Sequence, residues 1–257
     1  MNLKEKLEFH YKAFDKSQLE PDPLQFPHKF KDKKDIEVMA YISSVFAYGN
    51  IKQIISMLTK IVRLMNNEPY RFISSFDDKK DSITKGMKFR FYSENDIYRF
   101  FRLLSIAYNE FYSLKNLFRT GLNESDENVK NAISNFSKYF LDLYLNRYGK
   151  ISNGIKFMFP LPEKGSACKR MNLFLRWMIR KDELDLGLWD EIPATKLIIP
   201  VDTHIARICK SLKLTKIKNV SWKMAEEITN NLKRFDSSDP VKYDFAICHI
   251  GMRKLRF

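Results

Sequence analysis

The chain has 257 residues, of which 44% are hydrophobic and 14% aromatic, and this composition excludes a disordered protein. The formal net charge of +14 predicts a polyanionic partner, most simply nucleic acid, although such an excess also serves solubility. Three scattered cysteines, Cys168, Cys209 and Cys248, argue against a disulfide framework and favour a reducing cytoplasm. We find no apolar signal core and no apolar run near the ~20 residues of a membrane span, so we expect a cytoplasmic protein without a membrane partner.

Apolar residues recur at the helical period of 3.6 and seldom at the strand period of two, which predicts an all-α protein of about nine or ten helices. Pro21, Pro23 and Pro27 interrupt this pattern between residues 17 and 34, where we expect a linker. In the first half of the chain, helices are expected over residues 3–14, 36–48, 51–65, a short stretch from 69, 93–111 and 125–149. The expected N-caps are Asp35, Asn50, Ser93 and Ser125.

The second half of the chain begins with an expected loop over residues 150–165, because Pro160, Pro162 and Gly165 are turn formers. Apolar side chains at helical spacing then predict a helix over residues 171–179. The remaining expected elements are a connector over 181–200, a helix opened by Asp202, a helix capped by Ser221 and a last helix from Pro240.

Asp202 follows Pro200 and precedes an amphipathic helix, so its simplest role is that of an N-cap. The helix dipole favours its anionic form, and a carboxylate fixed there can also face a reacting centre. Lys169 lies opposite the apolar stripe of the preceding helix and shares a face with Arg176. In so basic a chain, such a face is typically solvated.

Four segments, in the same order along the chain, resemble those of the helix-hairpin-helix DNA glycosylases, the endonuclease III superfamily. Pro200–Arg207 is similar to their Val-Asp-Thr-His-hydrophobic-x-Arg segment, and Lys169–Asn172 to their Lys-Thr-Ala-Asn segment. The Lys and the Asp are 33 residues apart, a spacing closer to the archaeal 8-oxoguanine glycosylase branch. Phe245–Gly251 resembles the final helix of the superfamily, and Val45–Gln53 its helix-loop that wedges into the duplex. The whole chain also looks like a bacterial family related to these enzymes.

The resemblance implies a two-lobed, all-α glycosylase-like fold with a central cleft. One lobe would cover residues 34–180 with the hairpin and the Lys helix, and the other residues 1–33 and 181–257 with the Asp helix. Two departures stand out. Leu161–Ala167 replaces the expected Leu-Pro-Gly-Val-Gly hairpin and lacks one of its glycines, and the four-cysteine iron–sulfur loop is absent.

The resemblance also implies roles for individual residues. Lys169 would be the nucleophile, with its pKa lowered by burial or by Arg170 and Arg176, and Asp202 the essential carboxylate. The residues implied in DNA contact or wedging are Asn50, Gln53, Lys164, Gly165, Ser166, Arg170, Arg176, His204 and Arg207. The implied base-pocket residues are Trp189 and Phe245, although tryptophan is more typically core.

We expect no cofactor and no metal. His204, Cys209, Cys248 and His249 could converge if the last two helices pack together, but their spacings match no zinc pattern.

The resemblance therefore predicts a monomeric DNA repair glycosylase of the bacterial nucleoid. It would excise a damaged base, with 8-oxoguanine as one candidate, through a Schiff base of Lys169, followed by a lyase step. One alternative is a non-catalytic module of the same fold that binds DNA or RNA. Another is an interaction protein whose positive charge is compositional. The salt dependence of nucleic-acid binding distinguishes this interaction protein from the other two candidates, because a nucleic-acid binder loses affinity steeply between about 50 and 200 mM salt.

Overall fold

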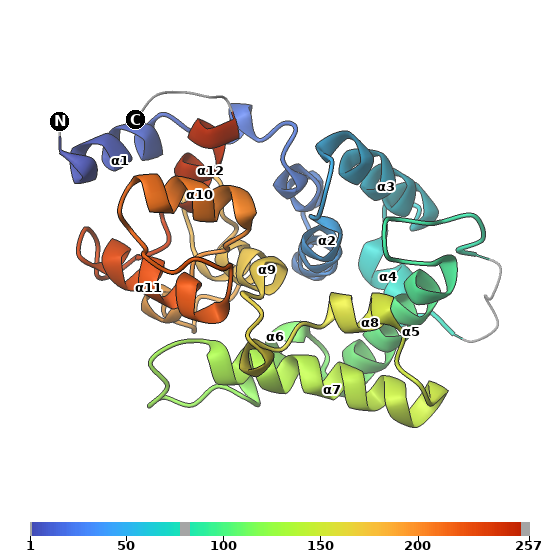
Figure 1. Ribbon diagram of the computed structural model, residues 1–257. Coiled ribbons are helices and arrows are strands. Elements are labelled where there is room, and N and C mark those ends of the chain that lie inside the picture. The colour runs from blue at the N-terminus through green and yellow to red at the C-terminus, as the bar shows by residue number, and fades with distance from the viewer. Residues whose placement is uncertain (1, 78–82, 253–257) are drawn as a thin grey trace. The chain divides into compact units, whose positions relative to one another are not determined.

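The computed structural model describes residues 2–77 and 83–252, and their side chains as far as residue 248. Helices follow one another through these residues, and the β pairing among them is limited to two isolated bridges, Phe89–Tyr92 and Lys181–Leu186 (Figure 1). The predicted all-α class is thereby confirmed. None of the described helices is both long and apolar enough to cross a membrane.

Contacts between residues divide the chain into two compact units. Unit 1 consists of residues 1–22, 126–129 and 162–257, and unit 2 of residues 23–125 and 130–161. Residues 162–180, which we expected in the central lobe, thus belong to the unit that contains Asp202. The physical reason is that this segment buries its side chains and makes its ion pairs within unit 1.

Unit 2 is built around one buried helix. Every residue of α2 from residue 37 to residue 46 is buried, as the apolar sequence on nearly all its faces predicts. α2 packs against α3 and α4, while α5 packs against α4, α6, α7 and α8 (Figure 1). The helices of unit 2 are α2 (Lys33–Phe46), α3 (Ile51–Leu64), α4 (Pro69–Ser74), α5 (Glu94–Phe111), α6 (Leu114–Arg119), α7 (Lys130–Tyr148) and α8 (Asn153–Met158).

Unit 1 has α9 as its central helix, because nine of its eleven residues are buried. α12 packs against α1 and α10. The helices of unit 1 are α1 (Leu3–Lys12), α9 (Lys169–Ile179), α10 (Thr203–Ser211), α11 (Trp222–Lys233) and α12 (Asp244–Met252).

Most of the expected helix starts are confirmed by side-chain caps. The side chains of Asn50, Ser93 and Ser221 each accept a backbone N–H bond from the first turn of the following helix. The start of α2 is a correction, since Asp32 caps it by accepting from the N–H groups of the second and third helical residues. Asp35 lies inside the helix, where its carboxylate accepts from the backbone N–H of Tyr70 at 2.8 Å.

Two short helices differ from expectation. α8 lies in the segment expected to be a loop, and α6 in a segment for which we predicted no helix. Each has six residues and a serine cap, Ser152 and Ser113, and a helix of this length is too short to show an apolar stripe. α7 and α12 begin five and four residues later than predicted, at Lys130 and Asp244.

Candidate active site

Asp202 caps α10, as predicted, and has one carboxylate oxygen left for another partner. Its Oδ1 accepts from the backbone N–H groups of His204 and Ile205, both at 2.9 Å. Its Oδ2 lies 2.8 Å from the Nζ of Lys169. Capping and contact with Lys169 therefore occur together on one side chain.

Lys169 is the first residue of α9, so the start of this helix determines where its amine lies. The preceding residue, Cys168, is in the left-handed conformation with φ 47°. Its backbone N–H donates to the Oγ of Ser166 at 3.2 Å, and the Nδ2 of Asn172 donates to the carbonyl of Ala167 at 3.0 Å. These bonds fix the turn that leads into α9.

The two side chains form an ion pair that is partly open to solvent, with Lys169 30% and Asp202 35% exposed. Burial opposes the charge on Lys169, but the Asp202 carboxylate outweighs it, so the pKa of Lys169 is raised above its ordinary value. Burial likewise opposes the charge on Asp202, and Lys169 with the two backbone N–H groups holds its pKa below the ordinary value. The pair is therefore ammonium and carboxylate at neutral pH.

This result corrects the expectation that Lys169 has a lowered pKa. Arg176 does not act as an unpaired cation beside it, because its guanidinium makes ion pairs with Asp185 and Asp244. Arg170 and Arg176 are both buried, at 7% and 3% exposure, and do not form the solvated face that helical spacing indicated. The reason is that α9 is enclosed on nearly all sides.

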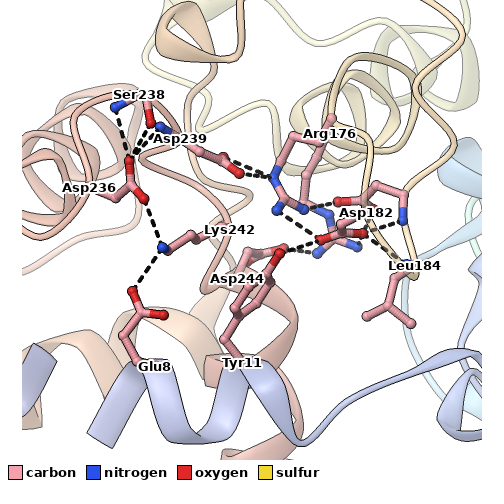
Figure 2. Close-up of polar contacts among 12 residues, drawn as sticks. Glu8, Tyr11, Arg176, Asp182, Leu184, Asp236, Ser238, Asp239, Lys242 and Asp244 are labelled. Carbon is pink, nitrogen blue, oxygen red and sulfur yellow. Dashed lines mark hydrogen bonds and ion pairs between the residues drawn. The ribbon is translucent and has the colours of Figure 1, made fainter. Parts of the chain in front are cut away.

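Unit 1 also contains a buried network of charges in which Arg176 and Arg180 make ion pairs with aspartates, and part of it is shown in Figure 2. Asp185 receives both guanidiniums, and its side chain is 1% exposed. Arg180 also contacts Asp239 through its Nε and Asp182 through its Nη2, each at 2.9 Å. Two guanidiniums thus meet four carboxylates, those of Asp182, Asp185, Asp239 and Asp244.

Helix α1 closes one side of this network. Figure 2 shows Lys242 between two carboxylates, with its Nζ 2.8 Å from Glu8 and 2.7 Å from Asp236. Glu8 also accepts from the hydroxyl of Tyr243, and the hydroxyl of Tyr11 donates to Asp182 at 3.1 Å. Polar contacts therefore fix the N-terminal helix to the residues just before α12 and to the connector after α9.

The altered hairpin lies just before α9. Lys164 and Gly165 are exposed, and Gly165 has a positive φ of 84°, which glycine adopts without strain. The carbonyl of Gly165 accepts from the backbone N–H of Trp222 at 3.2 Å, which ties the loop to α11. Ser166 is half-buried, with its hydroxyl directed to the start of α9. The three predicted DNA-contact residues thus flank the helix that holds Lys169.

Two further predicted residues lie on α10, one turn apart. Arg207 is exposed, and its Nη2 lies 3.3 Å from the Nδ1 of His204. Because a guanidinium can only donate, a hydrogen bond between these two side chains is accepted by Nδ1. Both residues share the N-terminal part of α10 with Asp202.

The two predicted base-pocket residues are enclosed by side chains. Trp189 is 1% exposed and packs edge-on against Phe174, with ring centroids 5.1 Å apart. Phe245 is 5% exposed and packs against Phe14 at 5.3 Å. Neither ring is open to a base in this arrangement, and their role in a base pocket stays a prediction.

In unit 2, Asn50 and Gln53 are exposed at the start of α3, where the wedge was predicted. Along the chain they follow Tyr48, which belongs to an aromatic cluster that we did not predict from the sequence. The cluster is formed by Tyr48, Phe91 and Phe157 together with Arg90. Phe91 is 57% and Tyr48 36% exposed, and the Arg90 guanidinium lies 4.7 Å from the Tyr48 ring centroid.

This aromatic cluster depends on a turn with a strained residue. Arg90 has φ 52°, and a Cβ on Gly49 would lie 2.7 Å from its guanidinium. Phe157 packs against both Tyr48 and Phe91, at 4.9 and 5.4 Å. A signal was present in the sequence, since basic and aromatic residues alternate from Lys88 to Phe91.

Over the described residues we find no group of three or more His, Cys, Asp or Glu side chains arranged to hold a metal ion. Cys209 and Cys168 are buried, and burial raises the pKa of each thiol to about 12. The side chain of His249 lies outside the described part of the structure.

Comparison with known proteins identifies a family. A family model described as "Protein of unknown function (DUF2400)" matches residues 22–253. No curated protein and no solved structure matches the chain. The match includes both Lys169 and Asp202 but excludes α1.

Proposed function

We propose that this chain, which belongs to the DUF2400 family, is a DNA glycosylase with an associated lyase activity. The observation that supports this most is the 2.8 Å contact between the amine of Lys169 and the carboxylate of Asp202 at the start of α10. The resemblance alone, which carries no spatial information, singles out the same two residues. A monomer acting on damaged duplex DNA in the bacterial nucleoid is the form of the activity that we expect.

The reaction would begin with extrusion of the damaged nucleotide, because a stacked base cannot be attacked. Asn50 or Gln53 would fill the gap in the duplex. The neutral Nζ of Lys169 would then form a bond to the sugar C1′ while the glycosidic bond breaks. The departing base takes that electron pair and a proton.

Asp202 would stabilise the positive charge that develops on the sugar. Opening of the sugar ring then gives a protonated imine between Lys169 and C1′. Loss of a proton from C2′ and departure of the 3′ phosphate complete the lyase step. Lys169 must first give up the proton that it shares with Asp202, so we expect the activity to rise with pH.

Borohydride trapping tests this proposal, because hydride converts the imine into a stable amine. The protein is incubated with borohydride and duplexes carrying an abasic site, uracil or 8-oxoguanine. A covalent adduct with at least one duplex is the expected result, and the base-containing substrate that reacts identifies the lesion. If none of the three duplexes yields an adduct, the protein is not a Schiff-base glycosylase.

The aromatic cluster of unit 2 is proposed as part of the DNA surface. Phe91→Ala is expected to weaken binding to a duplex with an unpaired base by about 5- to 150-fold, because stacking one base contributes about 1–3 kcal/mol. Fluorescence anisotropy at several salt concentrations measures this. Phe9→Ala is the matched control, since Phe9 is 62% exposed on α1 and outside the cluster. Equal losses in both variants would contradict a role for the cluster.

The alternative of a non-catalytic binding module is favoured by one observation, the raised pKa of Lys169, which keeps its amine protonated. It predicts strongly salt-dependent binding to nucleic acid together with a complete absence of trapping. The same experiments therefore distinguish the two functions.

A further inference from the structure

One face of α9 connects Lys169 to the buried network. Lys169 and Arg176 are seven residues apart, two helical turns, and so project from the same face. The guanidinium of Arg176 makes a direct ion pair with Asp244, the first residue of α12. Asp244 is 4% exposed. A buried carboxylate is thus held on the side of α9 that also presents the Lys169 amine.

Among the side chains that the structure describes, the charges of this network do not balance. Arg176 and Arg180 face four carboxylates, and Lys242 is already occupied by Glu8 and Asp236. The excess is negative, and it lies in a region of low exposure where charges are weakly screened. A cation nearby is stabilised by such an excess, and Lys169 is one.

We infer that Asp244, held by Arg176, is a positioning residue that keeps Lys169 protonated in the free protein and stabilises its cationic adduct with the sugar. The effect on the sugar adduct rests on the proposed function, whereas the effect on the protonation of Lys169 in the free protein does not. Asp244 contacts Arg176 and acts on Lys169 through its charge, whereas Asp202 contacts Lys169 directly.

The electrostatics of the site agree with this geometry. Asp202 has the largest influence among the charges that raise the pKa of Lys169, and Cys248 and Asp244 add to it. Burial raises the pKa of Asp244 itself to about 6, against the opposing effect of Arg176, so it is ionised wherever Lys169 titrates. The titratable or charged groups that influence these two residues are Asp202, Arg176, Asp185 and Cys248, and Cys209 in turn responds to the charge of Asp244.

The neutral variant Asp244→Asn is expected to fold, because its amide oxygen can still accept from the guanidinium of Arg176. A carboxyl whose folded pKa lies above its unfolded pKa stabilises the fold below about pH 4, and this contribution is lost as the pH rises through about 6. At neutral pH the ionised Asp244 is therefore not a net source of stability, and Arg176 retains Asp185 as a partner. Asp244→Ser removes the same charge with a smaller side chain.

Titration of Lys169 without any substrate tests the inference. Lysine amines are labelled with ¹³C by reductive methylation and followed by NMR against pH, with the Lys169 signal assigned from Lys169→Arg. In Asp244→Asn or Asp244→Ser, the titration of Lys169 is expected to move down by about one pH unit. Asp244→Glu, which keeps the charge, is expected to restore the titration of the unaltered protein. Asp239→Asn removes a carboxylate that contacts Arg180 rather than Arg176, and it is expected to shift the titration by much less than Asp244→Asn.

The second measurement is the pH profile of trapping on an abasic-site duplex. The acidic limb is expected to move down with the titration in Asp244→Asn, while the rate at the alkaline plateau falls because the cationic adduct is less stabilised. An unchanged Lys169 titration, or a shift of equal size in Asp239→Asn, overturns the inference. A shifted titration in a protein that never traps would instead show that the proposed function is wrong while the role of Asp244 holds.

Discussion

Replacing Lys169 with alanine is expected to abolish borohydride trapping on an abasic-site duplex, with a loss of about 10³-fold or more. The expectation follows from chemistry, because the imine nitrogen is the Nζ that the substitution removes. The fold should survive, since Lys169 makes one partly exposed ion pair, and such pairs contribute about 1 kcal/mol or less. Asp202 keeps both of its capping bonds in this variant. Quantification of the adduct by denaturing gel electrophoresis measures the loss.

Lys181→Ala is the matched control for this experiment. Lys181 is exposed and lies beyond the end of α9, outside the proposed site. Trapping at the level of the unaltered protein is expected for it. Adduct formation that persists in Lys169→Ala would place the nucleophile elsewhere, with Lys164 and Lys181 as the next lysines to replace.

Asp202 illustrates how much of the site could be predicted from sequence. A helix start after a proline predicts an N-cap, and the structure confirms both capping bonds. That Lys169 lies within contact of it could not follow from spacing, since the intervening 32 residues combine the rest of α9 with a connector that has no regular period. The pair was predicted from the resemblance alone, and the structure gives the 2.8 Å distance between the Nζ of Lys169 and the Oδ2 of Asp202.

Arg176 illustrates why the rest could not be predicted. A charged residue at helical spacing from Lys169 indicates a solvated face, because most lysines and arginines are exposed. In the structure Arg176 is buried and makes ion pairs with Asp185, in the connector after α9, and with Asp244, at the start of α12, and the sequence pattern of α9 indicates neither contact. The same holds for Phe91, whose exposure results from a turn with Arg90 at positive φ rather than from an apolar pattern.

The largest stability change in unit 1 is expected from Asp185→Asn. Asp185 receives both buried guanidiniums, and neutralising it leaves Arg176 and Arg180 with one fewer carboxylate in a region without water to replace it. Two buried charge-assisted contacts are weakened at once, and each contributes about 1.5–3 kcal/mol, so a loss of about 3–5 kcal/mol is expected although Arg176 keeps Asp244 and Arg180 keeps Asp182 and Asp239. Urea unfolding followed by circular dichroism measures the difference.

Asp190→Asn provides the comparison, because Asp190 lies in the same connector and is exposed. A change within about 0.5 kcal/mol is expected there, as for most surface substitutions. If Asp185→Asn were as mild, the two guanidiniums would have to be satisfied by Asp182, Asp239 and Asp244 alone. The remaining carboxylates would then be needed to compensate the two arginines. Less negative charge would be left to stabilise the protonated form of Lys169. The change in the free energy of unfolding in Asp185→Asn and the titration of the Lys169 amine therefore both depend on the same balance between carboxylates and guanidiniums.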